Sequence, residues 1–74
     1  MKITHIMHGE QSVLVIRSSL LHLLKHARVA GAALDAAPDA EVATTGVFWL
    51  KTVLTGKASD IEEARKAARL EEMH

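Results

Sequence analysis

Two short runs near the start of the chain have the residue pattern of β-strands. In residues 2–7 (KITHIM), Ile3, His5 and Met7 alternate with Lys2, Thr4 and Ile6. Residues 12–17 (SVLVIR) are rich in β-branched residues. HGEQ, a connection of four residues that contains Gly9, separates the two runs. Such a connection between two short apolar runs is typical of a hairpin. The pattern therefore predicts a hairpin over residues 2–17.

A helical period overlaps the second of these runs. Apolar residues recur at alternating spacings of three and four at Val13, Ile16, Leu20, Leu23, Ala27, Ala30 and Leu34. Such spacing is typical of a coiled-coil seam. Residues 2–17 therefore form either a hairpin that leads into a helix over residues 19–36, or a short strand followed by one long helix. Within the helix, we expect the leucines and alanines of this period, with Leu23 or Leu24, to lie on one side.

Two interruptions divide the chain into three segments. Pro38, within DAAPD, cannot continue a helix and pushes Ala37 toward an extended conformation. Gly56, within TGKASD, can adopt a positive φ, and Ser59 followed by Glu62 matches a capping box. We therefore expect the last helix to be capped by Ser59.

The helix predicted over residues 59–74 has a narrow apolar side. Good helix formers fill it, and Asp60 lies in the first turn, where the helix dipole favours negative charge. Its apolar positions are Ile61, Ala64, Ala68 and Leu70. We expect this helix to pack closely on a flat surface through its small residues.

The middle segment, residues 42–54, favours strand. It is rich in Val, Thr and aromatic residues. A helix capped by Asp39 and ended by Gly56 is the alternative. As a strand, it presents Phe48, Leu50, Thr52 and Leu54 on one face and Val47, Trp49, Lys51 and Val53 on the other. Both faces are largely apolar, and the rest of a short chain covers only one, so we expect an uncovered Trp–Val face.

These patterns predict an α+β fold, in which a small antiparallel sheet has two helices packed on one face. The alternative is an all-α fold of three helices with a short N-terminal strand. The 74 residues make one small domain, residues 1–74. A domain of this size buries only about 60% of the surface that its unfolded chain exposes, and self-association would add to this burial. We therefore expect a homodimer with an interface of Val13, Ile16, Leu20, Leu23 and Ala27.

The amino-acid composition limits the kinds of site and the cellular compartments that fit this chain. The chain contains no cysteine, which excludes disulfides and Cys-based zinc sites. Its longest apolar run, residues 29–34, is far shorter than the roughly 20 residues of a membrane span, and we expect a soluble cytoplasmic protein. The net charge is zero. Four basic residues and one acidic residue lie in residues 1–34, however, and five basic and eight acidic residues follow. The acidic half argues against bulk coating of nucleic acid.

The histidines are the candidates for metal binding. His22 and His26 have the spacing of two metal ligands on a helix, but no Glu follows His22 and Lys25 lies beside the pair. A third ligand would have to come from a distant acid or from His5, His8 or His74. We interpret His22 and His26 as the solvated side of an amphipathic helix, and we assign no metal and no cofactor.

Catalytic chemistry has little support in the sequence. No serine lies in a G-x-S-x-G context, and the glycines are too isolated to form a phosphate-binding loop. The acid pairs at residues 62–63 and 71–72 are adjacent on a helix, so their side chains point apart. We therefore expect a protein that is not an enzyme.

The remaining interpretation is a non-enzymatic interaction module, which docks on a macromolecule and inhibits or tethers it. The expected partner is a protein, and the candidate contacts are Trp49, Lys51 and Val53 on the uncovered strand face and Arg17, Lys25 and Arg28 on a basic helix face. The alternative is a small dimeric regulator that binds DNA or RNA phosphates through the basic helix face. Phe48 and Trp49 are the only aromatic residues, however, so no array exists on which bases would stack.

Overall fold

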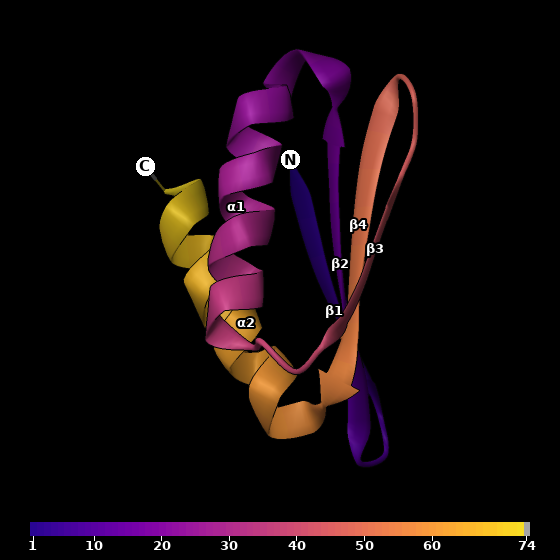
Figure 1. The fold of residues 1–74 in the computed structure, drawn as a ribbon, viewed down its shortest axis with the longest axis vertical. Helices are drawn as coiled ribbons and strands as arrows, with labels where there is room; N and C mark the ends of the chain where they lie inside the picture. Colours follow the sequence, from indigo (N-terminus) through magenta and orange to yellow (C-terminus); the bar gives the residue numbers. More distant parts are fainter. Residues whose placement is uncertain (74) are drawn as a thin grey trace.

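The computed structural model describes residues 1–73, which form an α+β fold with two layers (Figure 1). The elements in chain order are β1 (Lys2–His8), β2 (Gln11–Ser19), the 3₁₀ turn η1 (Leu20–His22), α1 (Leu23–Ala36), β3 (Glu41–Thr45), β4 (Trp49–Lys57) and α2 (Ala58–Glu72). The predicted fold class is confirmed, and the all-α alternative is wrong. His74 lies outside the described residues.

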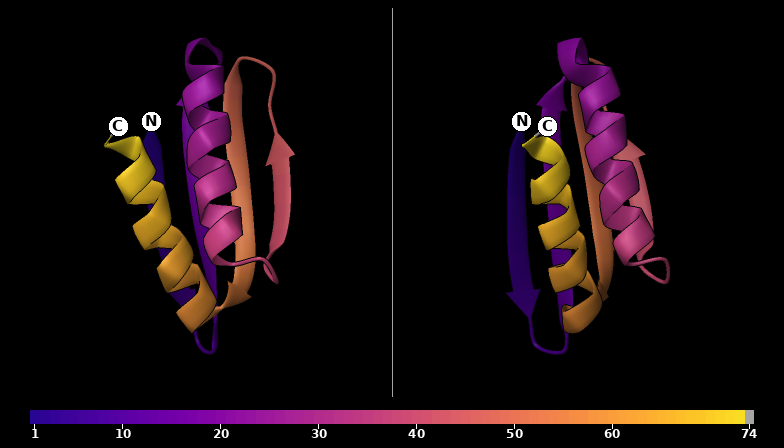
Figure 2. Two further views of the ribbon diagram at one scale, coloured as in Figure 1. Left: turned by 60° about the vertical axis from the view of Figure 1, so that its left-hand side comes forward. Right: turned by 90° about the vertical axis from the view of Figure 1, so that its left-hand side faces the viewer.

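The four strands form one antiparallel sheet in the order β1-β2-β4-β3. The two central strands, β2 and β4, are the long ones and pair along their whole length. Helices α1 and α2 lie side by side on one face of this sheet, and nothing within residues 1–73 covers the other face (Figure 2). Strands β2 and β4 therefore have one face toward the helices and one face toward solvent, whereas every residue of the edge strand β3 is exposed.

Glycine turns close both hairpins. Gly9 has φ 68° and is the first residue of the two-residue connection between β1 and β2, where hairpins favour glycine. Gly46 has φ 119°, and a Cβ there would overlap the Trp49 carbonyl oxygen. The hairpin predicted over residues 2–17 is confirmed. The strand predicted over residues 42–54 is two strands joined at residues 46–48.

The capping box predicted at Ser59 does not form. Strand β4 continues to Lys57, because Lys57 pairs with Gln11 of β2, and α2 begins at the next residue. No side chain caps the helix; instead the Ala58 N–H donates to the Glu10 carbonyl at 3.0 Å. Gly56 lies within β4 without a positive φ. A tertiary hydrogen bond thus replaces the local cap.

The core lies between the sheet and the two helices. Its largest fully buried apolar side chains are Leu14, Ile16, Val29, Leu54 and Ile61. Alanines of α1 and α2 complete it, and their small side chains allow the helices to lie close together. The predicted side of α2 is confirmed except at Leu70. That residue is nine positions after Ile61, which places it about 180° around the helix and in solvent.

The predicted apolar stripe of α1 is wrong except at Ala30, which packs against the core. The residues of α1 that are buried are His26, Val29 and Ala33, and the leucines of the helix start are exposed. Strand β2 extends to Ser19, so the helix begins only at Leu23 and its orientation is set by the intervening turn.

The coiled-coil seam does not form either, because it needs one continuous helix. Val13 and Ile16 lie in β2 on opposite faces of the sheet, and Ile16 is fully buried in the core. Leu20 lies in η1, and Leu23 and Ala27 lie in α1. The predicted dimer interface therefore has no common surface, and the homodimer itself stays a prediction.

Candidate interaction surface

The side of the sheet away from the helices is named the open face. Leu14 and Leu54 are fully buried under the helices, so their neighbours along each strand point to the other side. The aliphatic centre of the open face consists of Ile6, Val13, Val15, Ala43 and Val53, of which Val15 is only 8% exposed. An aliphatic centre of this kind on an outward sheet face is typical of a surface that meets another molecule.

Three cations cross the open face in one row. Lys2 pairs with Arg17, and Arg17 pairs with Lys51, so one cation lies on each of three adjacent strands. Within residues 1–73, none of the three forms an ion pair. This row is named the cationic row. Glu41 is the acid of the open face, and it lies opposite Thr55, which is four residues along β4 from Lys51.

Exposed apolar side chains gather at one end of the molecule. The corner between β2 and α1 lies next to the β3–β4 turn, and the Leu20 N–H donates to the Phe48 carbonyl at 2.9 Å (Figure 1). Leu21 is 93% exposed, Leu24 is 80% exposed, and Phe48 is 74% exposed. The set named the apolar end consists of Leu20, Leu21, Leu24, Val47, Phe48 and Trp49.

Trp49 joins the apolar end to the cationic row. Its side chain is 74% exposed, and the residue pairs with Ser19 at the start of β4. Two shallow hollows of about 430 and 410 Å³ lie beside it. Arg17 and Trp49 line both hollows, while Lys2 lines the first and Lys51 the second. The indole ring of Trp49 and the three cations of the cationic row therefore line the same two hollows.

The sequence-predicted contacts divide into two groups. Trp49, Lys51 and Val53 share the open face with Arg17, and the uncovered face expected for the middle segment is confirmed. Lys25 and Arg28 lie in α1, in the helical layer. The predicted basic helix face is therefore wrong, because Arg17 belongs to a strand and no helical line connects it with the other two.

Sequence reasoning missed Lys2 and most of the apolar end. The register of the first hairpin would have placed Lys2, because a two-residue turn at residues 9 and 10 makes residues 2 and 17 partners. The exposure of Leu21 and Leu24 has no comparable sequence signal, since leucine at the start of a helix is usually a core residue.

His26 is buried, contrary to the solvated position predicted for it. It is 4% exposed and lies between α1 and the sheet. Its Nδ1 is 2.6 Å from Ser18 Oγ, and its Nε2 is 2.7 Å from Thr52 Oγ1, which also bonds Thr44 Oγ1 at 2.9 Å. Burial lowers the pKa of His26. A neutral ring offers one donor and one acceptor, and hydroxyl groups satisfy both.

The Ser18–His26 pair ties α1 to β2 and has no access for a substrate. Both residues are buried, and the second ring nitrogen bonds Thr52 where a nucleophilic triad would have a carboxylate. The exposed His22 instead lies 3.0 Å from Ser19 Oγ. His22 precedes α1 and His26 lies within it, so the two rings do not share a helical face.

Other polar groups also lack the geometry of a metal site. His5 of β1 approaches Glu62 of α2, with Nδ1 and Oε2 3.6 Å apart, and a hydrogen bond from Arg65 lowers the pKa of Glu62. Within residues 1–73, no group of three or more His, Asp or Glu side chains is arranged to hold a metal ion.

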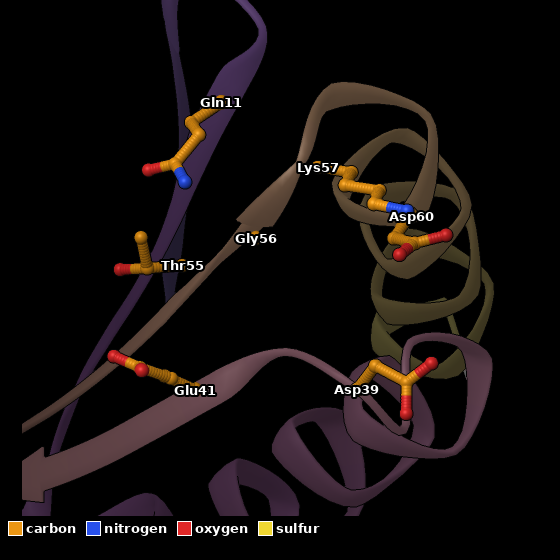
Figure 3. A pocket seen from close by; sticks show the side chains of 7 residues that line it. All are labelled: Gln11, Asp39, Glu41, Thr55, Gly56, Lys57 and Asp60. Atoms are coloured by element: carbon orange, nitrogen blue, oxygen red, sulfur yellow. The ribbon is translucent and has the colours of Figure 1, made fainter.

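An acidic hollow of about 460 Å³ lies at the opposite end from the apolar end. It is lined by Asp39, Glu41 and Asp60, and Lys57 also lines it (Figure 3). Glu41 points away from the two aspartates toward the side of Gln11 and Thr55. The carboxylates therefore do not converge on one point.

Comparison with protein-family models, with curated proteins and with solved structures finds no match to this chain. None of the helices described for residues 1–73 has the length and apolar character needed to cross a membrane.

Proposed function

We propose that the protein is a non-enzymatic interaction module that docks on a partner protein through the apolar end and the adjoining open face. Docking inhibits the partner when the chain covers a surface that the partner would otherwise use. It tethers the partner when the chain holds it in place without covering such a surface. The observation that carries the proposal is the exposure of Trp49 beside Phe48, Arg17 and the aliphatic centre of the sheet.

The residue types of the apolar end support a protein partner. Leucine, phenylalanine and tryptophan side chains are costly to leave in water, at roughly 25 cal/mol per Å² of apolar surface. Large exposed apolar residues clustered at one end are typical of protein interfaces, where tryptophan is enriched among the residues that dominate affinity. Trp49 would then be the central anchor, and the aliphatic residues of the open face would exclude water around it.

The proposal is tested by affinity capture from the native cell extract. The tagged protein, its Trp49→Ala variant and its Leu70→Ala variant are used as parallel baits, and the extracts are treated with nuclease before mass spectrometry. Leu70 is a matched control because it is exposed and apolar but lies on α2, in the helical layer. Circular dichroism of each bait checks that it is folded.

We expect one protein to be retained in near-stoichiometric amount by the wild type and by Leu70→Ala, and to be lost with Trp49→Ala. Equal retention by folded Trp49→Ala would overturn the proposal. Retention of proteins that all disappear after nuclease treatment would also overturn it, and would favour nucleic acid as the partner.

A further inference from the structure

The cationic row is an electrostatic cost within the folded chain. Partners directly opposite each other on neighbouring strands have Cβ atoms about 4.5–5.5 Å apart, and like charges at such positions are destabilising. Such opposite positions are occupied by Lys2 and Arg17 on β1 and β2, and by Arg17 and Lys51 on β2 and β4. Among the ion pairs formed within residues 1–73, none includes these three residues, so their charges are not neutralised by the fold.

We infer that the segment which covers the open face is an acidic polypeptide, whose carboxylates pair with the cationic row while an apolar side chain lies against Trp49. The inference rests on the proposed function and adds the chemistry of the partner. Arg17, at the centre of the row, offers the planar fork that binds a carboxylate through two parallel hydrogen bonds. Lys2 and Lys51 flank it as single charges.

Charge complementarity argues against the open face of a second copy as the occupant. The open face carries Glu41 as its acid, against the three cations of the row. Two copies placed face to face would therefore bury more positive than negative charge, and unpaired buried charge is strongly unfavourable. The occupant must bring more carboxylates or phosphates than the single Glu41 that the open face supplies.

The surface beside the cationic row favours a polypeptide over a nucleic acid. Proteins that bind single strands stack successive bases on several aromatic side chains. The centre of the open face is instead aliphatic, with Val13, Val15 and Val53, and Trp49 is the aromatic residue at its border. An aliphatic centre with a charged border is the usual anatomy of a protein–protein interface.

The two hollows give the occupant a place for both kinds of side chain. Each is lined by Trp49, by Arg17 and by one lysine. A chain in which acidic and apolar residues alternate would place carboxylates toward the cations and apolar groups toward the ring. Such alternation is natural for an extended segment, whose successive side chains point to opposite sides.

Trp49 itself reports occupancy, because it is the only tryptophan and the chain has no tyrosine. The probe is a synthetic 12-residue peptide of alternating Glu and Leu with blocked ends. The matched peptide has Gln in place of Glu, and a third ligand is a 12-nucleotide deoxythymidine strand. Each is titrated at low and at high salt while the emission maximum of Trp49 and its quenching by acrylamide are recorded.

We expect the Glu peptide to shift the emission of Trp49 to shorter wavelength and to protect it from acrylamide, with affinity that falls as salt is added. The Arg17→Glu/Lys51→Glu variant should bind at least about tenfold more weakly. The matched control Lys66→Glu/Arg69→Glu changes the same number of charges on the exposed side of α2 and should bind like the wild type.

Equal binding of the Gln peptide, no binding of the Glu peptide, or unchanged binding by the folded Arg17→Glu/Lys51→Glu variant would overturn the inference. Tighter binding of the deoxythymidine strand would overturn it in favour of nucleic acid. If the acidic peptide fails while Trp49→Ala still loses the captured protein, the proposed function stands and only the acidic chemistry of the partner is wrong.

Discussion

The two faces of the sheet carry similar aliphatic residues but meet different surroundings. In β2, Leu14 and Ile16 point into the core, and Val13 and Val15 point to the open face. The covered side of β2 has serines at its two ends and no charge, whereas the open side has Arg17. The difference teaches that aliphatic composition alone does not identify the core of a small sheet. The position of cations and of exposed tryptophan separates the face that folds the protein from the face available to a partner.

The largest effect that separates the two faces is expected from adjacent residues of β4. Leu54→Ala removes a fully buried side chain and should lower the free energy of unfolding by about 2–5 kcal/mol. Val53→Ala, on the open face, should lower it by about 1 kcal/mol or less. Urea denaturation of both variants measures the contrast. Similar losses at the two positions would mean that the open face also belongs to the core.

His26 gives the covered face a pH dependence. Burial lowers its pKa from the ordinary value of 6.5, so the unfolded chain binds a proton more readily than the folded one. Stability from this residue is therefore complete above about pH 6.5 and is lost as the pH falls below that value. Loss of Glu62 ionisation affects a separate, more acidic range, below its ordinary pKa of 4.5.

The substitution His26→Gln should remove this dependence between pH 7.5 and pH 5.5. It should also cost about 1–3 kcal/mol at pH 7.5, because the hydrogen bonds with Ser18 and Thr52 are disturbed. Urea denaturation at several pH values checks both expectations. His22→Gln, at an exposed histidine, is the control. A wild-type stability that does not change between these pH values would contradict the assignment to His26.

A smaller effect of opposite sign is expected on the open face. Lys51→Glu places a carboxylate opposite Arg17 and should raise the free energy of unfolding by about 0.2–1 kcal/mol at low salt. The gain should shrink as salt is added. Lys66→Glu is the control, because Lys66 lies 3.6 Å from Glu63 and its reversal should lower stability slightly. A loss of stability in Lys51→Glu would show that the cationic row is not repulsive.

The local sequence pattern was sufficient to predict the elements that are determined by residues close together in the chain. The connection at Gly9 predicted the first hairpin, Pro38 predicted the end of α1, and alternation from Trp49 to Val53 predicted which side of β4 would stay uncovered. That alternation also predicted that Trp49, Lys51 and Val53 would share a surface, since side chains two apart in a strand share a face. Phe48, expected on the face of Leu50 and Leu54, instead lies in the turn before β4 and is exposed.

The features that failed depend on partners distant in the chain. His26 is buried because Ser18 and Thr52, 8 and 26 residues away, satisfy its ring. Ser59 lost its capping role because β4 pairs with β2 up to Lys57. Arg17 does not belong to a basic helix face, because residues 11–19 form a strand of the sheet. In the sheet, Arg17 pairs with Lys51. These contacts cannot be predicted from helical spacing alone, because they join residues that are far apart in the sequence.

The most direct measurement combines stability and capture for one variant, Trp49→Ala. If Trp49 serves docking and not folding, the free energy of unfolding should change by no more than about 0.5 kcal/mol, as expected for an exposed site, while the captured partner is lost. Retention of the partner by Trp49→Ala would contradict the account. So would a loss of several kcal/mol in stability, which would make Trp49 a residue of the core.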